Sequence, residues 1–320
     1  MKRRNFISKS VGAATALTLL GLSACKDKSN TKSDSQNINH SKTNPLFFKL
    51  SLAQWSLHRA LFNKEMQHLD FAAKARQFNF EGLEYVNAFF HDKANDKAFL
   101  SEMNSRANSE GLQNVLIMID GEGALADQDN AKRLQAIENH YKWVEAAHYL
   151  GCHAIRVNLA GGVHADEAAK ASLDSLSKLS DFAAGSNINI LVENHGGFSS
   201  NGAWMDQVFS KVKNKNCGTL PDFGNFCIEK DNNGHCIEAY DKFQGIKDLL
   251  PYAKAISAKS YDFNDEGDET QIDYYKTIKL IKDSGYNGFI GVEYEGKNTS
   301  EEKGIILTRD LLIRAGTQVS

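Results

Sequence analysis

Three acidic residues stand where short apolar segments of the sequence end. These are Glu193, Asp222 and Glu293, and turn-like sequence follows each of them. Carboxylates that converge in one place repel one another, so their pKa values rise unless a cation lies among them. Hard divalent cations prefer carboxylate oxygen as a ligand. The pattern therefore predicts a site for one divalent metal ion, of the Mn, Mg or Co type.

Other polar residues share these segment ends and predict how a substrate is held. Lys259 could polarise a substrate carbonyl or bind its oxyanion; the alternative is an ion pair with Asp222 or Glu293 that balances charge. Arg156 alternates with apolar neighbours, so we expect it to point inward and to orient a glutamate or a substrate hydroxyl, because an unpaired buried charge is costly. The residues that we expect to bind substrate are His195, Arg156, Asn158, Asn225, Trp55 and Glu84.

Short apolar segments alternate with longer amphipathic ones beyond residue 45, and this arrangement positions the polar residues. The eight predicted strands are Lys49–Trp55, Gly82–Val86, Val115–Ile119, Ala154–Asn158, Asn189–Glu193, Gly218–Asp222, Ala255–Lys259 and Gly288–Glu293. The predicted helices include Glu65–Gln77, Ala131–Leu150, Ala165–Ala184, Gly202–Val212, Ile272–Ser284 and Glu301–Ala315. Strands that alternate with helices pair in parallel through crossovers.

Eight such units in roughly 270 residues predict an α/β fold closed into a (β/α)8 TIM barrel. An open doubly wound sheet is the alternative, but no G-x-G-x-x-G follows the first strand. The alternation of side chains along a strand directs Glu193 and Glu293 inward, at the carboxyl ends of their strands. Barrel enzymes place their active sites on that face.

Composition excludes several classes of protein. Apolar residues make up 42% of the 320 residues and charged residues 24%, which are ordinary values for a globular chain. With 37 basic and 40 acidic residues, the net charge is -3, so we expect no nucleic-acid partner. No apolar run reaches the roughly 18 residues that a membrane-spanning helix needs.

The N-terminus predicts export and a lipid anchor. The segment from Arg3 to Lys9 resembles the twin-arginine export motif, and the apolar stretch from Val11 to Leu22 has the length of a signal-peptide core. Leu22-Ser23-Ala24-Cys25 resembles a bacterial lipobox, which implies lipidation of Cys25. We therefore divide the chain into an export signal (1–25), a flexible polar tether (26–45) and a catalytic barrel (46–320), located in the periplasm or cell envelope.

Four further cysteines are Cys152, Cys217, Cys227 and Cys236, and none forms a C-x-x-C pair. Their spacing therefore argues against a structural zinc site. In an oxidising compartment Cys227 and Cys236 could pair across one loop, but spacing alone leaves this open.

Four blocks of this sequence resemble the xylose-isomerase-like TIM barrels and, more narrowly, the sugar phosphate isomerase/epimerase group. The blocks are Leu191–Gly197, Leu220–Phe226, Ala255–Ser260 and Gly291–Glu295. The resemblance implies that Glu193, Asp222 and Glu293 hold the metal ion. The family often has His-x-His-x-Lys on its seventh strand, but here the aligned residues are Ala255, Ser257 and Lys259. The fourth metal ligand is therefore a weak ligand, water or His195.

The resemblance implies a metal-dependent isomerase or epimerase of a sugar or sugar derivative. Glu193 and Glu293 would exchange a carbon-bound proton through an enediolate, with Lys259 as a third catalytic residue. Two alternatives are a keto-glycoside lyase or hydrolase on the same barrel, and a sugar-binding lipoprotein without catalysis. The expected partners are a small carbohydrate and, through the anchor, a membrane; a homo-oligomer is left open.

Overall fold

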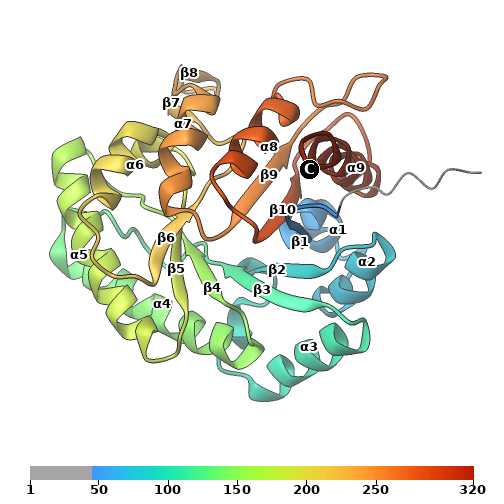
Figure 1. The fold of residues 1–320 in the computed structure, drawn as a ribbon. Coiled ribbons are helices and arrows are strands. Elements are labelled where there is room, and N and C mark those ends of the chain that lie inside the picture. The colour runs from blue at the N-terminus through green and yellow to red at the C-terminus, as the bar shows by residue number, and fades with distance from the viewer. Residues whose placement is uncertain (1–44) are drawn as a thin grey trace, which may run out of the picture. The chain divides into compact units, whose positions relative to one another are not determined.

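Residues 45–320 are described by a computed structural model, and they form a barrel of parallel strands surrounded by helices (Figure 1). The barrel strands are β1 (Lys49–Ala53), β2 (Gly82–Val86), β3 (Gln113–Met118), β4 (Ala154–Val157), β5 (Asn189–Glu193), β6 (Cys217–Leu220), β9 (Ile256–Ser260) and β10 (Phe289–Tyr294). Their order is β6-β5-β4-β3-β2-β1-β10-β9, and parallel bridges from Thr219 to Ala253 and from Asp222 to Ser257 join the two ends. The predicted (β/α)8 barrel is confirmed.

Helices connect the strands and cover the outside of the barrel. The α-helices are α1 (His58–Phe62), α2 (Phe71–Gln77), α3 (Lys97–Ser109), α4 (Asn130–Leu150), α5 (Ala165–Ala184), α6 (Gly202–Phe209), α7 (Lys242–Leu249), α8 (Tyr274–Asp283) and α9 (Glu301–Val319). Short 3-10 helices are η1 (Gln54–Leu57), η2 (His68–Asp70), η3 (Asn87–Phe89), η4 (His91–Lys93), η5 (Gly197–Ser200) and η6 (Leu250–Tyr252). Aspartate side chains cap several helix N-termini, among them Asp129 before α4 and Asp273 before α8.

Side chains along each strand alternate between two apolar regions. Ile155 and Val157 belong to the large core between the strands and the helices. Leu191 belongs to a smaller cluster that also contains Ala53 and Leu116. Since Glu193 follows Leu191 by two residues, it extends from the same face of β5, toward the barrel interior.

The structure departs from the sequence-based boundaries in several places. The first strand ends at Ala53 rather than Trp55, because the chain turns there into η1. The helix expected from Glu65 begins only at Phe71, after η2. α3 was not predicted, since its buried residues are only Leu100, Met103 and Ala107 and its apolar stripe is sparse. α7 was also missed, because it is only eight residues long.

An antiparallel hairpin follows the sixth barrel strand and was not predicted. It consists of β7 (Cys227–Lys230) and β8 (Cys236–Ala239), which extend from the barrel beside α7 (Figure 1). A disulfide joins Cys227 to Cys236, the pairing that spacing had left open. Cys152 and Cys217 are buried free thiols.

Within residues 45–320, no helix has both the length and the apolar character needed to cross a membrane. The predicted export signal (1–25), the lipidation site Cys25 and all of the tether except its last residue lie outside the described residues.

Candidate active site

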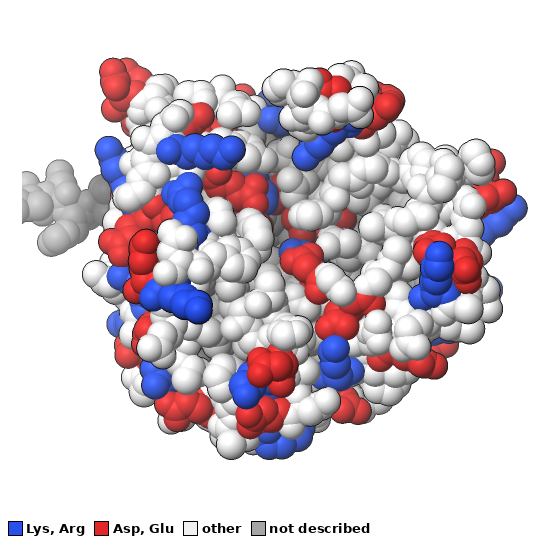
Figure 2. All heavy atoms as spheres, turned by 180° about the vertical axis from the view of Figure 1, so that it is seen from behind, with Lys and Arg blue, Asp and Glu red and all other residues white. Residues whose placement is uncertain are grey.

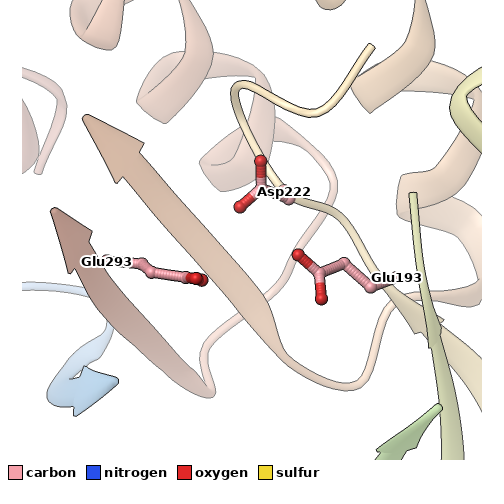
Figure 3. A group of neighbouring side chains, drawn as sticks. All are labelled: Glu193, Asp222 and Glu293. Atoms are coloured by element: carbon pink, nitrogen blue, oxygen red, sulfur yellow. The ribbon is translucent and has the colours of Figure 1, made fainter. Parts of the chain in front are cut away.

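Three carboxylates converge at the carboxyl end of the barrel (Figure 3). Glu193 ends β5, Glu293 lies near the end of β10, and Asp222 follows β6 by two residues. Each offers an oxygen that lies within 4.8 Å of the others, and none of the three residues is more than 3% exposed. The structure therefore brings together the three acids that the sequence singled out.

Two buried cations accompany the acids. The Nε atom of Arg156 lies 2.8 Å from Glu193 Oε2, and its Nη1 donates to Asp120 Oδ1 at 2.8 Å. Lys259 Nζ donates to Glu293 Oε1 at 2.9 Å and lies 3.4 Å from Glu295 Oε2. The position of Lys259 is compatible with both alternatives. Its ion pairs balance the charge of the acids, and its side chain also lines the cavity, where it could contact a substrate.

The surroundings of the three acids separate their pKa values. Burial raises the pKa of Glu193 to about 7 although Arg156 opposes the shift. Burial likewise raises the pKa of Asp222 to about 7 against the pull of Lys259. Burial also disfavours the charged form of Glu293, but the charge and hydrogen bond of Lys259 outweigh it and lower the pKa of Glu293 below its usual value. Glu293 is thus the acid most readily ionised, whereas Glu193 and Asp222 can carry protons near neutrality.

Ser257 links two of the acids, a role that sequence reasoning did not assign to it. Its hydroxyl lies 2.6 Å from Asp222 Oδ2 and 2.9 Å from Glu293 Oε2. A hydroxyl has one proton and can donate to only one of these oxygens at a time. A second hydrogen bond requires a proton on one carboxyl, and the raised pKa of Asp222 makes it the natural holder.

Amide side chains fix the strand ends that carry the acids. Asn225 Nδ2 donates to Glu193 Oε1 at 3.0 Å. Asn194 accepts from the backbone N–H of Asp222 at 2.7 Å and donates to its carbonyl at 3.0 Å, so it ties the end of β5 to the loop after β6. Asn194 was not predicted; its position directly after Glu193 was the only signal in the sequence.

A cavity of about 620 Å³ opens beside the acids. Among the predicted site residues it is lined by Trp55, Arg156, His195, Asn225, Lys259 and Glu293. Tyr261 and Glu295 line it as well, and Glu295 accepts a hydrogen bond from the Trp55 indole. Acidic and basic side chains are seen together in a hollow on one face of the molecule (Figure 2).

Four predicted residues do not line this cavity. Glu193 and Asp222 lie behind its wall, in contact with the lining residues Asn225 and Lys259. Asn158 is only partly buried and donates to Asp120 at 2.8 Å, so it supports the wall.

Glu84 is the fourth predicted residue that does not line the cavity. The prediction that it contacts substrate is therefore wrong. Glu84 is 1% exposed, accepts a hydrogen bond from Ser51 at 2.6 Å, and has its pKa raised to about 8 by burial. Strand pairing places it level with Leu116 and hence with Ala154, two residues before Arg156 on β4. Glu84 therefore lies below the acids rather than at the mouth of the barrel.

The three converging carboxylates fit a divalent cation by their donor chemistry. All are hard oxygen ligands, and Glu193 Oε2 is a buried acceptor that receives no hydrogen bond, although the Arg156 guanidinium lies 2.8 Å from it. His195 is exposed at the rim, and its backbone N–H donates to Ser199. Among the described residues, the group able to hold a metal consists of the three acids without His195.

Comparison with solved structures reveals the same fold in other proteins, two of which are sugar epimerases. D-psicose 3-epimerase from Clostridium cellulolyticum H10 is similar with a TM-score of 0.61 at 13% identity, over 85% of this chain and 96% of that one. The 3-keto-D-glucoside 4-epimerase of E. coli has a TM-score of 0.62 at 15% identity, over 83% and 99%. The IOLI protein with a bound zinc atom has a TM-score of 0.67 at 14% identity, over 85% and 99%.

A search among curated proteins found no match in sequence. A family model, by contrast, matches residues 72–315, which include every acid and cation of the site. With the barrel and the position of the acids at its carboxyl end, this match shows that the chain belongs to the family of xylose isomerase-like TIM barrels.

Proposed function

We propose that this protein is an exported, metal-dependent isomerase or epimerase of a sugar or sugar derivative. The observation that carries the proposal is a glutamate on the wall of a polar cavity, paired with a lysine that lowers its pKa, with a second glutamate of raised pKa close behind it. These are Glu293 and Glu193. Pairs of carboxyls whose surroundings push their pKa values apart are typical of acid–base catalysis. The names of the structural neighbours, two of them sugar epimerases, support a carbohydrate substrate.

In the proposed reaction Glu293 removes a proton from the carbon next to a substrate carbonyl. The electron pair of the broken C–H bond moves toward the carbonyl oxygen and forms an enediolate. Lys259 lies beside Glu293, and its ammonium stabilises the negative charge that develops on that oxygen. Return of a proton to the former carbonyl carbon, with the proton of the adjacent hydroxyl passing to the former carbonyl oxygen, yields an isomer. Return of a proton to the opposite face of the carbon that lost it yields an epimer.

Glu193 is the proposed source of the returning proton. Its pKa of about 7 allows it to carry a proton under neutral conditions. Arg156 and Asn225 contact its two carboxylate oxygens and hold them in position. Both side chains also line the cavity, so Glu193 lies directly behind its wall.

Glu193, Asp222 and Glu293 are the residues that would hold the metal ion. When bound, a divalent cation supplies a positive charge that stabilises oxygen anions of the substrate. One structural neighbour, the IOLI protein, contains a bound zinc atom, and the carboxylate donors also suit Mg²⁺ or Mn²⁺.

The test is conversion of sugars by the purified protein. Aldoses, ketoses and keto-glycosides are incubated with the protein and Mg²⁺, Mn²⁺ or Zn²⁺, and products are identified by NMR. The proposal predicts a stereoisomer or a positional isomer of at least one substrate. Release of the aglycone would favour the keto-glycoside lyase or hydrolase. Binding of sugars without any product would favour the non-catalytic lipoprotein.

The proposal includes export and a lipid anchor. Its support is the sequence alone: the twin-arginine-like segment, the short apolar stretch and the lipobox that ends in Cys25. The disulfide between Cys227 and Cys236 is compatible with an oxidising compartment outside the cytoplasm.

A further inference from the structure

The cavity extends outward from the catalytic acids to two rim features. Its volume of about 620 Å³ lies in the middle of the ~300–1,000 Å³ range of pockets that take drug-sized ligands. Glu293 and Lys259 are almost completely buried at its base. Phe62 and Lys230, both exposed, belong to its outer wall. A substrate that touched only the acids would leave this outer part unused.

One rim feature is an aromatic cluster, formed by the exposed Phe62 and the partly buried Trp55 and Phe89; of these, Phe62 and Trp55 line the cavity. Phe62 is 55% exposed, compared with 36% for Phe182 and 37% for Tyr149 on other parts of the surface. Its ring is nevertheless held in place, with its centroid 5.1 Å from that of Phe89 and 6.0 Å from that of Trp55. An exposed apolar patch beside a cavity is a common mark of a binding surface. Aromatic faces of this kind pack against the C–H face of a sugar ring.

The other rim feature is the disulfide-linked hairpin of β7 and β8. Cys227 and Lys230 of this hairpin line the cavity. The disulfide to Cys236 and the pairing of Cys227 with Ala239 fix the hairpin at its base. A further backbone hydrogen bond runs from Tyr240 to Phe226. The hairpin therefore forms a firm outer wall although most of its residues are exposed.

We infer that the substrate is an extended carbohydrate whose outer sugar ring binds between the aromatic cluster and the hairpin, while the reacting sugar lies at the acids. This inference names the substrate class and rests on the proposed function for the reacting sugar. The outer ring binds through its apolar face and contributes affinity, and it takes no part in proton transfer. The preferred substrates are thus disaccharides or glycosides with a second sugar ring.

The test compares each member of a panel of hexoses with disaccharides that contain it. Binding is measured by calorimetry and by the fluorescence of the tryptophans, since Trp55 lines the cavity. We expect at least one disaccharide to bind about tenfold more tightly than its own monosaccharide. Phe62→Ala should weaken the binding of that disaccharide by about 3- to 10-fold, which corresponds to the loss of one aromatic contact. The affinity for the monosaccharide should stay unchanged.

Two further variants complete the experiment. Phe182→Ala is the control, because Phe182 is an exposed phenylalanine that stacks on Tyr141 away from the cavity. Replacing both Cys227 and Cys236 by Ser should loosen the hairpin. This change should weaken the binding of the disaccharide but not the binding of the monosaccharide. The inference is wrong if no disaccharide binds more tightly than its monosaccharide. It is also wrong if Phe62→Ala weakens the binding of the disaccharide and of the monosaccharide by the same factor. Preference for aryl glycosides over disaccharides would also overturn it.

These outcomes separate the inference from the proposed function. A disaccharide that binds through Phe62 without being converted would support the outer site and contradict the isomerase. Suppose instead that a monosaccharide is converted as efficiently as any disaccharide and that Phe62→Ala has no effect. That result would support the isomerase and contradict the outer site.

Discussion

Arg156→Met tests whether the buried charges of the site depend on one another. Arg156 is 3% exposed and lies within 2.8 Å of both Glu193 and Asp120. Methionine fills similar space but removes the positive charge, which leaves Glu193 buried without its cation. Loss of one partner of a buried ion pair costs about 3–5 kcal/mol of unfolding free energy. Asp120 is 37% exposed and can be solvated instead, so the cost arises mainly at Glu193.

The loss is measurable by thermal unfolding. A change of 1 kcal/mol shifts Tm by about 2–4 °C in a domain of roughly this size, so Arg156→Met should lower Tm by about 6–20 °C. Circular dichroism at pH 7.5 follows the transition. The decrease should shrink at pH 5, where Glu193 is protonated in the folded protein because burial raises its pKa to about 7.

Arg106→Met is the matched control. Arg106 pairs with Glu102 at 2.8 Å on the surface of α3, and its side chain is 42% exposed. Surface pairs of this kind contribute about 0–1 kcal/mol. If Arg156→Met lowered Tm no more than Arg106→Met, or equally at both pH values, the description of Arg156 as the cation that holds Glu193 would be refuted.

Three further predictions concern catalysis, pH and the anchor. Glu293→Gln should lower kcat by about 10²–10⁴-fold with little change in KM, as measured by steady-state kinetics, while the exposed control Glu302→Gln keeps wild-type activity. Burial raises the pKa of Glu84 to about 8 and the pKa values of Glu193 and Asp222 to about 7. Their stabilising effect is therefore complete below the ordinary pKa values of 4.5 for Glu and 3.8 for Asp, and it is lost as the pH rises through 7 to 8. Buried histidines such as His68, whose pKa burial lowers to about 3, act in the opposite direction at pH 5, so the effect of one acid is isolated with Glu84→Gln. In chemical denaturation the stability of Glu84→Gln relative to wild type should be higher at pH 8 than at pH 5, and added Mn²⁺ should stabilise wild type more at pH 8; the reverse order would contradict the assignment. Cys25→Ala should release the protein from the membrane fraction or leave its signal uncleaved, and unchanged fractionation and mass would argue against lipidation.

The barrel and its three acids could be predicted because their signals are periodic. Each barrel strand is a short apolar run, and each helix between them is longer, so the count of eight and the parallel pairing follow from the order of the segments. Side-chain alternation then assigned Glu193 and Arg156 to the inner face. The structure places both side chains in the buried cluster of charges at the carboxyl end.

The level of each side chain along the barrel axis could not be predicted in the same way. Alternation gives the face of a strand but not its level relative to its neighbours, which depends on the register of pairing. Glu84 was therefore expected near the substrate, whereas the pairing of β2 with β3 places it below the acids. Register also explains Ser257, which bridges to Asp222 of the loop after β6 and so contacts two acids.

The hairpin of β7 and β8 was missed for a different reason. Its residues are mostly exposed and polar, so the segment lacks the apolar run that marks the barrel strands. Its pairing is irregular as well, with register shifts on both sides of Glu229. The one signal in the sequence was the pair of cysteines, and spacing alone did not determine whether they were joined.

Exchange of carbon-bound hydrogen with solvent tests the central claim most directly. The protein, loaded with Mg²⁺ or Mn²⁺, is incubated in deuterium oxide with the panel of sugars and disaccharides, and the recovered carbohydrate is examined by NMR and mass spectrometry. Proton removal by Glu293 predicts that deuterium enters one carbon next to the carbonyl, and that Glu293→Gln slows this entry by at least about 10²-fold. Product that forms without solvent deuterium, or label that enters equally fast in wild type and Glu293→Gln, would contradict proton transfer by this glutamate.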